Sequence, residues 1–278
     1  MKIPLVNRRN ELKILHIWDV AGVSSCLTKY LRKHGIESDV LMRGGYLSNS
    51  ITHFYGNKVL YQNPKKFSLQ VILKSRNYDI IHVHSTRPIL KWVKILAKKP
   101  TILHYHGSEV RDFSIEERKE EKFADKIIVS TEDLLENRFY KDPTYLPNIV
   151  DTELFSKKEF PKNNEGFVRL KKNQTVEQTQ KLLKENGFDI KLESINYNQL
   201  IHFAGLIDFL KYFQWYVDLP IINCKIIKAN SLLGLQCMSM GMEVICHDFQ
   251  VRSKIPEENQ PQQVLEKLIP IYEELVKK

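Results

Sequence analysis

"YDIIHVHSTRPILKWVKILAKKPTILHYHG", residues 78–107, is the stretch that decides the fold. Residues 78–85 and 101–107 are short apolar runs typical of buried strands, and residues 88–99 between them have the length and spacing of a helix. Because both runs are continuously apolar rather than alternating, both faces of their sheet must be covered. The stretch therefore predicts a strand–helix–strand unit of a parallel α/β sheet.

The same alternation extends over most of the chain. Before residue 146 it predicts strands at 12–20, 38–43 and 124–131 and helices at 26–35 and 67–77. Residues 146–166 have the Pro, Asn and Lys content of a linker. Beyond it, helices are predicted at 175–187, 198–213, 231–241 and 262–278, and strands at 188–194, 215–219, 221–227 and 242–248. We expect two doubly wound parallel α/β domains, 1–150 and 151–258, and a terminal helical segment, 259–278.

Composition limits the classes of function. A net charge of +9 suits phosphorylated small molecules, an acidic membrane surface or nucleic acid, and equally a generally lysine-rich surface. No nucleic-acid-binding motif is visible, which argues against the third partner. No run of about 18 uncharged apolar residues occurs, the N-terminus lacks a signal-peptide core, and the four cysteines form no C-x-x-C pair. We therefore expect a cytosolic protein with reduced, buried thiols.

Four histidines stand two apart in the quoted stretch. Residues two apart in a strand share a face, so His82 and His84 point the same way, as do His104 and His106. A metal site is one interpretation, but no H-x-x-x-H or H-E pair supports it, and we expect none. The other is that His82 and His104 are buried and bonded by the backbone. His106 ends its strand before a glycine, where ligands bind in open α/β sheets, and is the candidate site residue.

Several segments resemble, in order, landmarks of a known family. "LHYHGSEVR" (103–111), "ADKIIVSTEDLLE" (124–136), "LPNIVDTELF" (146–155) and "LLGLQCMSMGMEVICHD" (232–248) are similar to GT-B-fold glycosyltransferases, closest to the retaining family 4 type. The resemblance implies two Rossmann-like domains facing across a cleft, with a terminal helix crossing back to the first domain. It implies a nucleotide-diphosphate-sugar donor in the second domain, the acceptor in the first, and neither metal nor cofactor.

The resemblance also assigns roles to residues of the first domain. His106, Gly107 and Glu109 match the family's H-G-x-E segment, in which the histidine lies beside the transferred sugar and is catalytic. A neutral imidazole can hydrogen-bond a sugar or leaving group, and its pKa lies near working pH. A loop before a helix offers backbone N–H groups to phosphate. The acceptor or phosphate loop is assigned to Gly22, Val23 and Ser24 after the first strand, together with Arg111 beside the H-G-x-E segment.

The second domain departs from the family pattern at its two carboxylates. Gln236 stands where the second glutamate of E-x7-E would be, and Lys228 where the first would be. Gln236 keeps hydrogen bonds without charge assistance, whereas Lys228 reverses the sign. Backbone N–H groups of Ser231, Leu232 and Leu233 are predicted to form a free helix N-terminus that holds the diphosphate. Arg169, Lys171 and Lys172 are candidates for the family's phosphate-clamping pair.

Two functions remain open from the sequence. The first is a metal-independent, retaining hexosyltransferase that uses a nucleotide-diphosphate sugar and a glycan or lipid-linked acceptor, in the cytoplasm or peripherally at the inner face of the membrane. The second is a non-catalytic homologue that binds a glycan, a nucleotide or a partner enzyme. Binding of a nucleotide sugar that protects the fold from melting would distinguish them.

Overall fold

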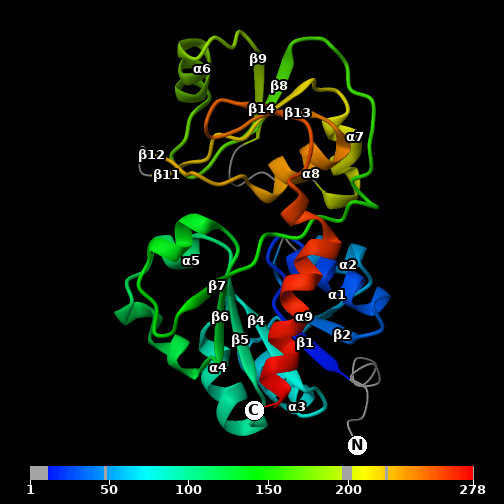
Figure 1. Ribbon diagram of the computed structural model, residues 1–278, viewed down its shortest axis with the longest axis vertical. Helices are drawn as coiled ribbons and strands as arrows, with labels where there is room; N and C mark the ends of the chain where they lie inside the picture. Colours follow the sequence, from blue (N-terminus) through cyan, green and yellow to red (C-terminus); the bar gives the residue numbers. More distant parts are fainter. Residues whose placement is uncertain (1–11, 47–48, 196–201, 223–224, 278) are drawn as a thin grey trace, which may run out of the picture. The chain divides into compact units, whose positions relative to one another are not determined.

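The computed structural model of the protein describes residues 12–46, 49–195, 202–222 and 225–277. It divides into two compact units, one made of the residues up to Ile149 together with those from Pro261 onward, the other of Val150–Gln260. Each unit has its own sheet (Figure 1). The chain therefore builds most of the first unit, completes the second, and returns to the first.

The sheet of the first unit has seven parallel strands in the order β3-β2-β1-β4-β5-β6-β7. They are β1 (Lys13–Ile17), β2 (Glu37–Arg43), β3 (Lys58–Leu60), β4 (Ile80–His84), β5 (Thr101–Tyr105), β6 (Lys126–Val129) and β7 (Pro143–Tyr145). All five strands predicted before residue 146 are confirmed, and β3 and β7 were not predicted. The order reverses between β1 and β4, where ligands bind in sheets of this kind.

Helices and short helical turns connect these strands. They are α1 (Val23–Lys33), α2 (Asn49–Phe54), α3 (Pro64–Ser75), α4 (Pro88–Trp92), the short α5 (Ser108–Arg111), a 3-10 segment (Glu116–Phe123), a 3-10 turn (Glu132–Glu136) and α9 (Pro261–Lys277). The predicted helix at 88–99 is only partly α-helical, because α4 continues as a π-helical turn, Val93–Ala97. That turn ends at Lys98, whose φ of 55° is left-handed and cannot continue the helix.

The two faces of this sheet differ in chemistry. Alternate residues such as Ile81 and Val83 point into an apolar core with side chains of α3, α4 and the π-helical turn. The intervening His82 and His84 point to the other face, which α1 and α9 cover. One face is thus an ordinary hydrophobic core, and the other carries a row of buried imidazoles.

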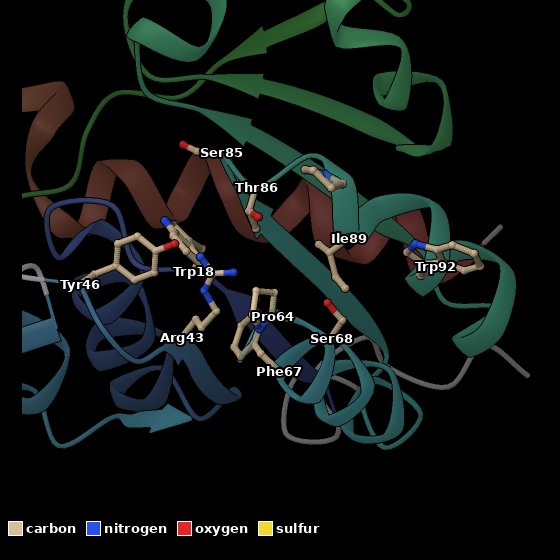
Figure 2. A pocket seen from close by; sticks show the side chains of 11 residues that line it. Trp18, Arg43, Tyr46, Pro64, Phe67, Ser68, Ser85, Thr86, Ile89 and Trp92 are labelled. Carbon is tan, nitrogen blue, oxygen red and sulfur yellow. The ribbon is translucent and has the colours of Figure 1, made fainter. Parts of the chain in front are cut away.

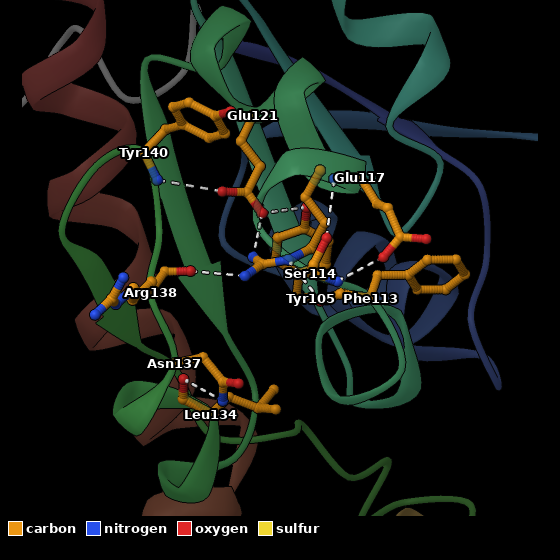
Figure 3. A network of polar contacts seen from close by, with 10 residues as sticks. Tyr105, Phe113, Ser114, Glu117, Glu121, Leu134, Asn137, Arg138 and Tyr140 are labelled. Atoms are coloured by element: carbon orange, nitrogen blue, oxygen red, sulfur yellow. Dashed lines mark hydrogen bonds and ion pairs between the residues drawn. The ribbon is translucent and has the colours of Figure 1, made fainter.

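A buried ion pair fixes the segments that follow β5 (Figure 3). The guanidinium of Arg118 pairs with Glu121, and both side chains are almost fully buried. Glu121 also accepts a hydrogen bond of 2.8 Å from the Tyr105 hydroxyl, and Arg118 donates one of 2.6 Å to the carbonyl oxygen of Arg138. Because removing one partner of a buried pair leaves an uncompensated charge, this network holds the 3-10 segment against the sheet.

The second unit has a mixed sheet in the order β14-β13-β10-β8-β9. Its strands are β8 (Glu165–Arg169), β9 (Lys191–Ile195), β10 (Trp215–Val217), β13 (Glu243–Ile245) and β14 (Val251–Arg252), all parallel except β14. Its helices are α6 (Val176–Glu185), α7 (Leu206–Leu210) and α8 (Leu232–Met240), with 3-10 turns at Phe203–Gly205 and Glu257–Asn259. Thr175 caps α6 by accepting a hydrogen bond from Gln178 N, as the sequence predicted.

Three predictions for this half need correction. The strand predicted at 221–227 is a two-stranded antiparallel hairpin, β11 (Ile221–Ile222) and β12 (Lys225–Ile226). In the predicted helix at 198–213, only the 3-10 turn and α7 are helical among the described residues, and 198–201 lie outside them. The linker predicted at 146–166 contains the boundary between the two units, at Ile149 and Val150, but it ends earlier than predicted because β8 begins at Glu165.

Two sequence expectations concern the whole chain. Cys26, Cys237 and Cys246 are buried free thiols, as expected, while Cys224 lies outside the described residues. Among the described residues, no helix is both long enough and apolar enough to cross a bilayer.

Candidate functional site

His106 stands at the carboxyl edge of the first sheet, directly after β5. It is partly exposed, whereas His16, His82, His84 and His104 on the neighbouring strands are at most 1 % exposed. The strand registers align these side chains, since His16 pairs with His82 and His84 pairs with His104. The position at the end of the strand, which the sequence predicted for His106, is therefore correct.

Five imidazoles and two hydroxyls form one continuous run of hydrogen bonds, here called the histidine chain. Its members in order are His16, His84, His106, Ser130, His104, His82 and Tyr272 of α9. The six contacts are His16 Nδ1–His84 Nε2 3.0 Å, His84 Nδ1–His106 Nε2 3.0 Å, His106 Nδ1–Ser130 Oγ 2.9 Å, Ser130 Oγ–His104 Nε2 2.8 Å, His104 Nδ1–His82 Nε2 3.2 Å and His82 Nδ1–Tyr272 Oη 2.7 Å. Side chains, not the backbone, therefore satisfy His82 and His104, which corrects the sequence interpretation.

The imidazoles of the chain are neutral at neutral pH. Burial lowers the pKa of His16 to about 3, and burial with the neighbouring imidazoles lowers the pKa values of His82, His84 and His104 well below the usual value. Burial also lowers the pKa of His106, although the charge of Glu109 and a hydrogen bond that the Asn148 side chain accepts from the ring oppose the shift. His106 consequently presents an uncharged ring with one donor and one acceptor nitrogen.

Both ring nitrogens of His106 already have partners, so a ligand must share or replace one of them. A neutral imidazole carries a single N–H, and each bond of the histidine chain therefore depends on the tautomers of its two partners. If the proton of His106 moves from one ring nitrogen to the other, the proton of His84 must move in the same way. The hydroxyl of Ser130 must then exchange its donor and acceptor roles. The structure thus couples the tautomer of His106 to residues on four strands and on α9.

The segment after His106 is shaped around Glu109. Its carboxylate oxygen Oε1 accepts hydrogen bonds from the His106 backbone N–H at 2.5 Å and from Ser85 Oγ at 2.6 Å. Gly107 has φ 152°, and a Cβ there would lie 2.4 Å from a guanidinium nitrogen of Arg111. Arg111 itself forms a two-pronged ion pair with Asp133, with N–O distances of 2.8 and 3.0 Å. Arg111 is therefore held inside the unit and does not form part of an open phosphate loop.

The loop after β1 is likewise closed around an acid. Gly22 has φ 85°, and a Cβ there would lie 2.6 Å from a methyl of Ile51. Val23 and Ser24 are buried, and the Ser24 hydroxyl donates a 2.6 Å hydrogen bond to the carbonyl of Trp18. The carboxylate of Asp19 accepts hydrogen bonds from the backbone N–H and the hydroxyl of Ser25. The carboxylate of Asp19 thus takes the place at the first turn of α1 that a phosphate would occupy. This differs from the predicted phosphate loop of Gly22, Val23 and Ser24.

The second unit repeats this arrangement at α8. The Asp218 carboxylate, which follows β10, accepts a 2.7 Å hydrogen bond from Ser231 N, and Ser231 Oγ caps Gly234 N at 3.0 Å. A Cβ at Gly234 would lie 2.2 Å from an Asp218 oxygen, so only glycine fits there. The predicted free helix N-terminus is therefore partly occupied. Among the described residues, the N–H groups of Leu232 and Leu233 have no partner and remain for a ligand.

The charges around α8 are mixed. Burial raises the pKa of Asp218, while its hydrogen bonds with Ser231 and the nearby Lys171 and His247 lower it. Lys228 is exposed, as expected for a solvated lysine, and Gln236 is 8 % exposed on α8. Arg169 is exposed at the end of β8. A diphosphate near α8 would meet these cations and also the carboxylate of Asp218.

The histidine chain also contains two possible metal-binding groups among the described residues. His16, His82 and His84, and separately His84, His104 and His106, each bring ligand nitrogens within 4.8 Å of one another. Three imidazoles suit zinc or copper by ligand type. The absence of H-x-x-x-H spacing did not exclude such a group, because adjacent strands bring together residues far apart in sequence. Most of these nitrogens are hydrogen-bonded within the histidine chain, whereas His16 Nε2 is buried with no partner among the described residues.

Residues 24–154 match the sequence profile of Glycosyltransferase Family 4. The match covers 131 of the 278 residues, a little under half of the chain. The matched residues include His106 and the members of the histidine chain that lie on β4, β5 and β6. No curated protein matches the chain in a sequence search.

Solved structures extend the comparison to the whole chain. S. aureus MnaA in complex with UDP is 12 % identical, with a TM-score of 0.52 over 95 % of this chain and 89 % of that one. Acinetobacter baumannii MurG is 10 % identical, with a TM-score of 0.43 over 95 % of this chain and 93 % of that one. The likeness to MnaA is one of fold. The predicted GT-B-type fold with two Rossmann-like units is thereby confirmed.

Sequence reasoning missed Asp19, Ser130, Asp218 and Tyr272. Asp19 and Asp218 share a signal that could have found the pair, since each lies within two residues of the carboxyl end of an apolar strand. Ser130 also ends a strand, one step after β6. No sequence signal points to Tyr272, which approaches the site only because α9 returns to the first unit.

Proposed function

We propose that the protein transfers a sugar from a nucleotide-diphosphate donor to an acceptor held by the first unit, with retention and without a metal. The family match across residues 24–154, which includes His106, carries the proposal. His106 supports it chemically, because a neutral imidazole at the carboxyl edge can accept a proton from a sugar hydroxyl or donate one to the leaving phosphate. The low pKa keeps its acceptor nitrogen available across the physiological range.

Donor binding would rest on the backbone more than on side chains. The N–H groups of Leu232 and Leu233 at α8 favour a diphosphate, and the exposed Lys228 and Arg169 add positive charge. Asp218 opposes the diphosphate by like-charge repulsion from a buried position. We therefore propose weak donor binding in which the phosphates, not the ribose, supply most of the affinity.

Asp218 is also the observation that favours the second candidate, a non-catalytic homologue. A carboxylate bonded to Ser231 N imitates the anion that the helix would otherwise bind. Gln236 and Lys228 replace both carboxylates expected for sugar and ribose contacts. If Asp218 cannot be displaced, the second unit binds no nucleotide and the first unit alone recognises a glycan.

Replacing Asp218 by asparagine is expected to strengthen nucleotide binding about tenfold. The amide keeps an oxygen for Ser231 N but removes the charge that repels the phosphates, an effect worth about 1.4 kcal/mol. Titration calorimetry with UDP, GDP and the corresponding nucleosides, in EDTA, measures it. Asp208→Asn is the matched control, because Asp208 is exposed on α7 and pairs only with Lys211. Absence of binding to both proteins would favour the non-catalytic function, and binding by the wild type that survives loss of the phosphates would refute the phosphate-led donor site.

A basic and apolar surface of the first unit supports peripheral membrane binding. Leu69 and Leu73 on α3, and Trp92, Ile95 and Leu96 on α4 and the π-helical turn, are exposed, and the two segments contact each other. Residues 61–100 contain nine lysine and arginine residues and a single acid, Asp79. Basic residues near an anionic bilayer contribute about 1 kcal/mol each, and exposed apolar side chains add insertion energy.

Vesicle binding should therefore depend on this surface. The protein is expected to sediment with vesicles of 70 % phosphatidylcholine and 30 % phosphatidylserine, and Lys65→Glu/Lys91→Glu should reduce the bound fraction at least tenfold, since the double change reverses two charges. Lys181→Glu/Lys184→Glu on α6 makes the same charge change in the second unit and should have little effect. Equal losses in both double variants would show a net-charge effect and remove this surface from the proposal.

A further inference from the structure

A cavity opens at the carboxyl ends of β1, β2 and β4 (Figure 2). It has a volume of about 440 Å³. Its walls come from the first unit alone and combine aromatic rings with hydroxyl groups and one cation. The lining residues are Trp18, Arg43, Tyr46, Pro64, Phe67, Ser68, Ser85, Thr86, Pro88, Ile89 and Trp92. None of these described residues is an acid, so the cavity has a positive charge without a counter-charge.

Arg43 is the charged group of this cavity, and no acid among the lining residues neutralises it. Its guanidinium lies 5.6 Å from the ring centre of Trp18 and 5.0 Å from that of Tyr46, between the two rings (Figure 2). Cation–π contacts fix its plane without consuming its N–H donors. Its Nε is buried, and among the described residues no acceptor reaches it. A buried donor without a partner is costly, so a small rotation of the side chain that brings this donor to a ligand acceptor would be favoured.

We propose that this cavity binds the phosphate of the acceptor substrate, with the group attached to that phosphate lying between the aromatic side chains. Arg43 supplies the planar pair of donors that phosphate oxygens match, and Thr86 adds a hydroxyl donor. Trp18, Tyr46 and Trp92 provide flat surfaces for an apolar or glycosyl body. Recognition of an uncharged glycan would leave the guanidinium unpaired.

The cavity is linked to the candidate catalytic residue by one side chain. Ser85, which lines it, donates a 2.6 Å hydrogen bond to the same Glu109 oxygen that accepts from the backbone N–H of His106. Ser85 thus joins the wall of the cavity to the carboxylate that also holds the backbone of His106. Calling the ligand the acceptor substrate rests on the proposed function. The assignment of a phosphate-binding site to this cavity does not.

Two sources of such a phosphate are compatible with the walls, a soluble sugar phosphate and a lipid-linked phosphate. Trp92 is shared by the cavity and the exposed apolar surface of α3 and α4, which offers a path for a lipid chain. The shared chemistry is a phosphate ester with a bulky body. Probes of the two kinds distinguish the sources while testing the same cavity.

Phenyl phosphate is the first probe, because it joins a phosphate to an aromatic body. Two of the chain's three tryptophans, Trp18 and Trp92, line the cavity, so binding should change the intrinsic fluorescence. The wild type is expected to bind phenyl phosphate at least tenfold more tightly than either inorganic phosphate or phenol. Arg43→Gln should lose at least tenfold in affinity, and Arg43→Lys should lose less, because lysine keeps the charge but not the planar donors. Arg76→Gln, an exposed arginine after α3, is the control.

Unchanged affinity in Arg43→Gln, with a melting temperature like that of the wild type, would overturn the proposal. If Arg43→Gln fails to fold, Arg43→Lys and Trp92→Phe decide, and unchanged binding in both would overturn it equally. Competition of phenyl phosphate by vesicles containing 20 % phosphatidic acid would indicate a lipid source, and competition by glucose 1-phosphate a soluble one. The measurement uses neither donor nor turnover, so a failure of sugar transfer would leave its result intact.

Discussion

Acidification from pH 7.5 to 5.5 is expected to unfold the first unit. His16, His82, His84 and His104 have pKa values lowered by burial, so the native state stays unprotonated while the unfolded chain binds protons below about pH 6.5. Native-state stability from these groups is complete above that pH and is lost as the pH falls. Each contributes about 1.4 kcal/mol at one pH unit below 6.5, or about 6 kcal/mol for the four. That is comparable to the whole stability of many domains.

Thermal melting followed by circular dichroism between pH 8.0 and 5.0 measures this dependence. Between pH 6 and 5, unfolding of His16→Asn should take up about one proton fewer than unfolding of the wild type, because one buried imidazole is removed. The free energy of unfolding should therefore depend less steeply on pH. His53→Asn is the control, since His53 is exposed at the end of α2 and should leave the slope unchanged. A melting temperature that stays constant down to pH 5 would show that the imidazoles are not buried in neutral form.

His106→Ala is expected to lower turnover about 10²- to 10⁴-fold, the range for removing a group that exchanges protons with the reacting atoms. The loss of stability should be smaller, about 1–3 kcal/mol, because His84 Nδ1 and Ser130 Oγ lose a partner in a partly exposed place. Turnover is measured as nucleotide-diphosphate release from the donor sugar that binds most tightly, with water as acceptor, in the presence of EDTA.

Ser130→Ala distinguishes the catalytic role of the His106 ring from the support that its hydrogen-bond partners give it. It leaves the imidazole of His106 in place but removes the hydroxyl that joins His106 to His104. Its turnover should fall between those of the wild type and His106→Ala, and its pH profile should shift because the tautomer of His106 is no longer fixed from that side. Equal turnover in His106→Ala and the wild type would refute the role assigned to His106.

The sequence predicted the first sheet well because its strands are short, apolar and separated by helices with clear ends. Residues 12–20 and 101–107 carry that pattern within themselves, and β1 and β5 lie inside them. The strand β7 is three residues long and contains Pro143, so no local pattern distinguishes it from a loop. The hairpin of β11 and β12 was missed for a related reason, since two-residue strands have no period to detect.

The candidate site was predicted only in part, because its partners come from different elements. The end of a strand and a following glycine were enough to place His106 correctly. The bonds of His106 to His84 and Ser130 depend on sheet register, which the order of strands sets and local sequence does not. Arg111 and Ser24 were assigned to ligands because residue type and loop position were known, whereas their partners Asp133 and Trp18 were not. The same reason explains why Arg118 and Glu121 attracted no notice.

The return of α9 to the first unit has a consequence for synthesis of the protein. Tyr272 covers the histidine face, yet roughly 110 residues of the second unit are made between Ile149 and Pro261. At about 5–20 residues per second, the ribosome takes roughly 5–20 s to make these residues. The first sheet lacks α9 during that time. During this interval α1 alone covers the face, so burial lowers the pKa values of the imidazoles less than it does in the finished protein. The nascent first unit is therefore more sensitive to acid and to chaperone capture than the finished protein.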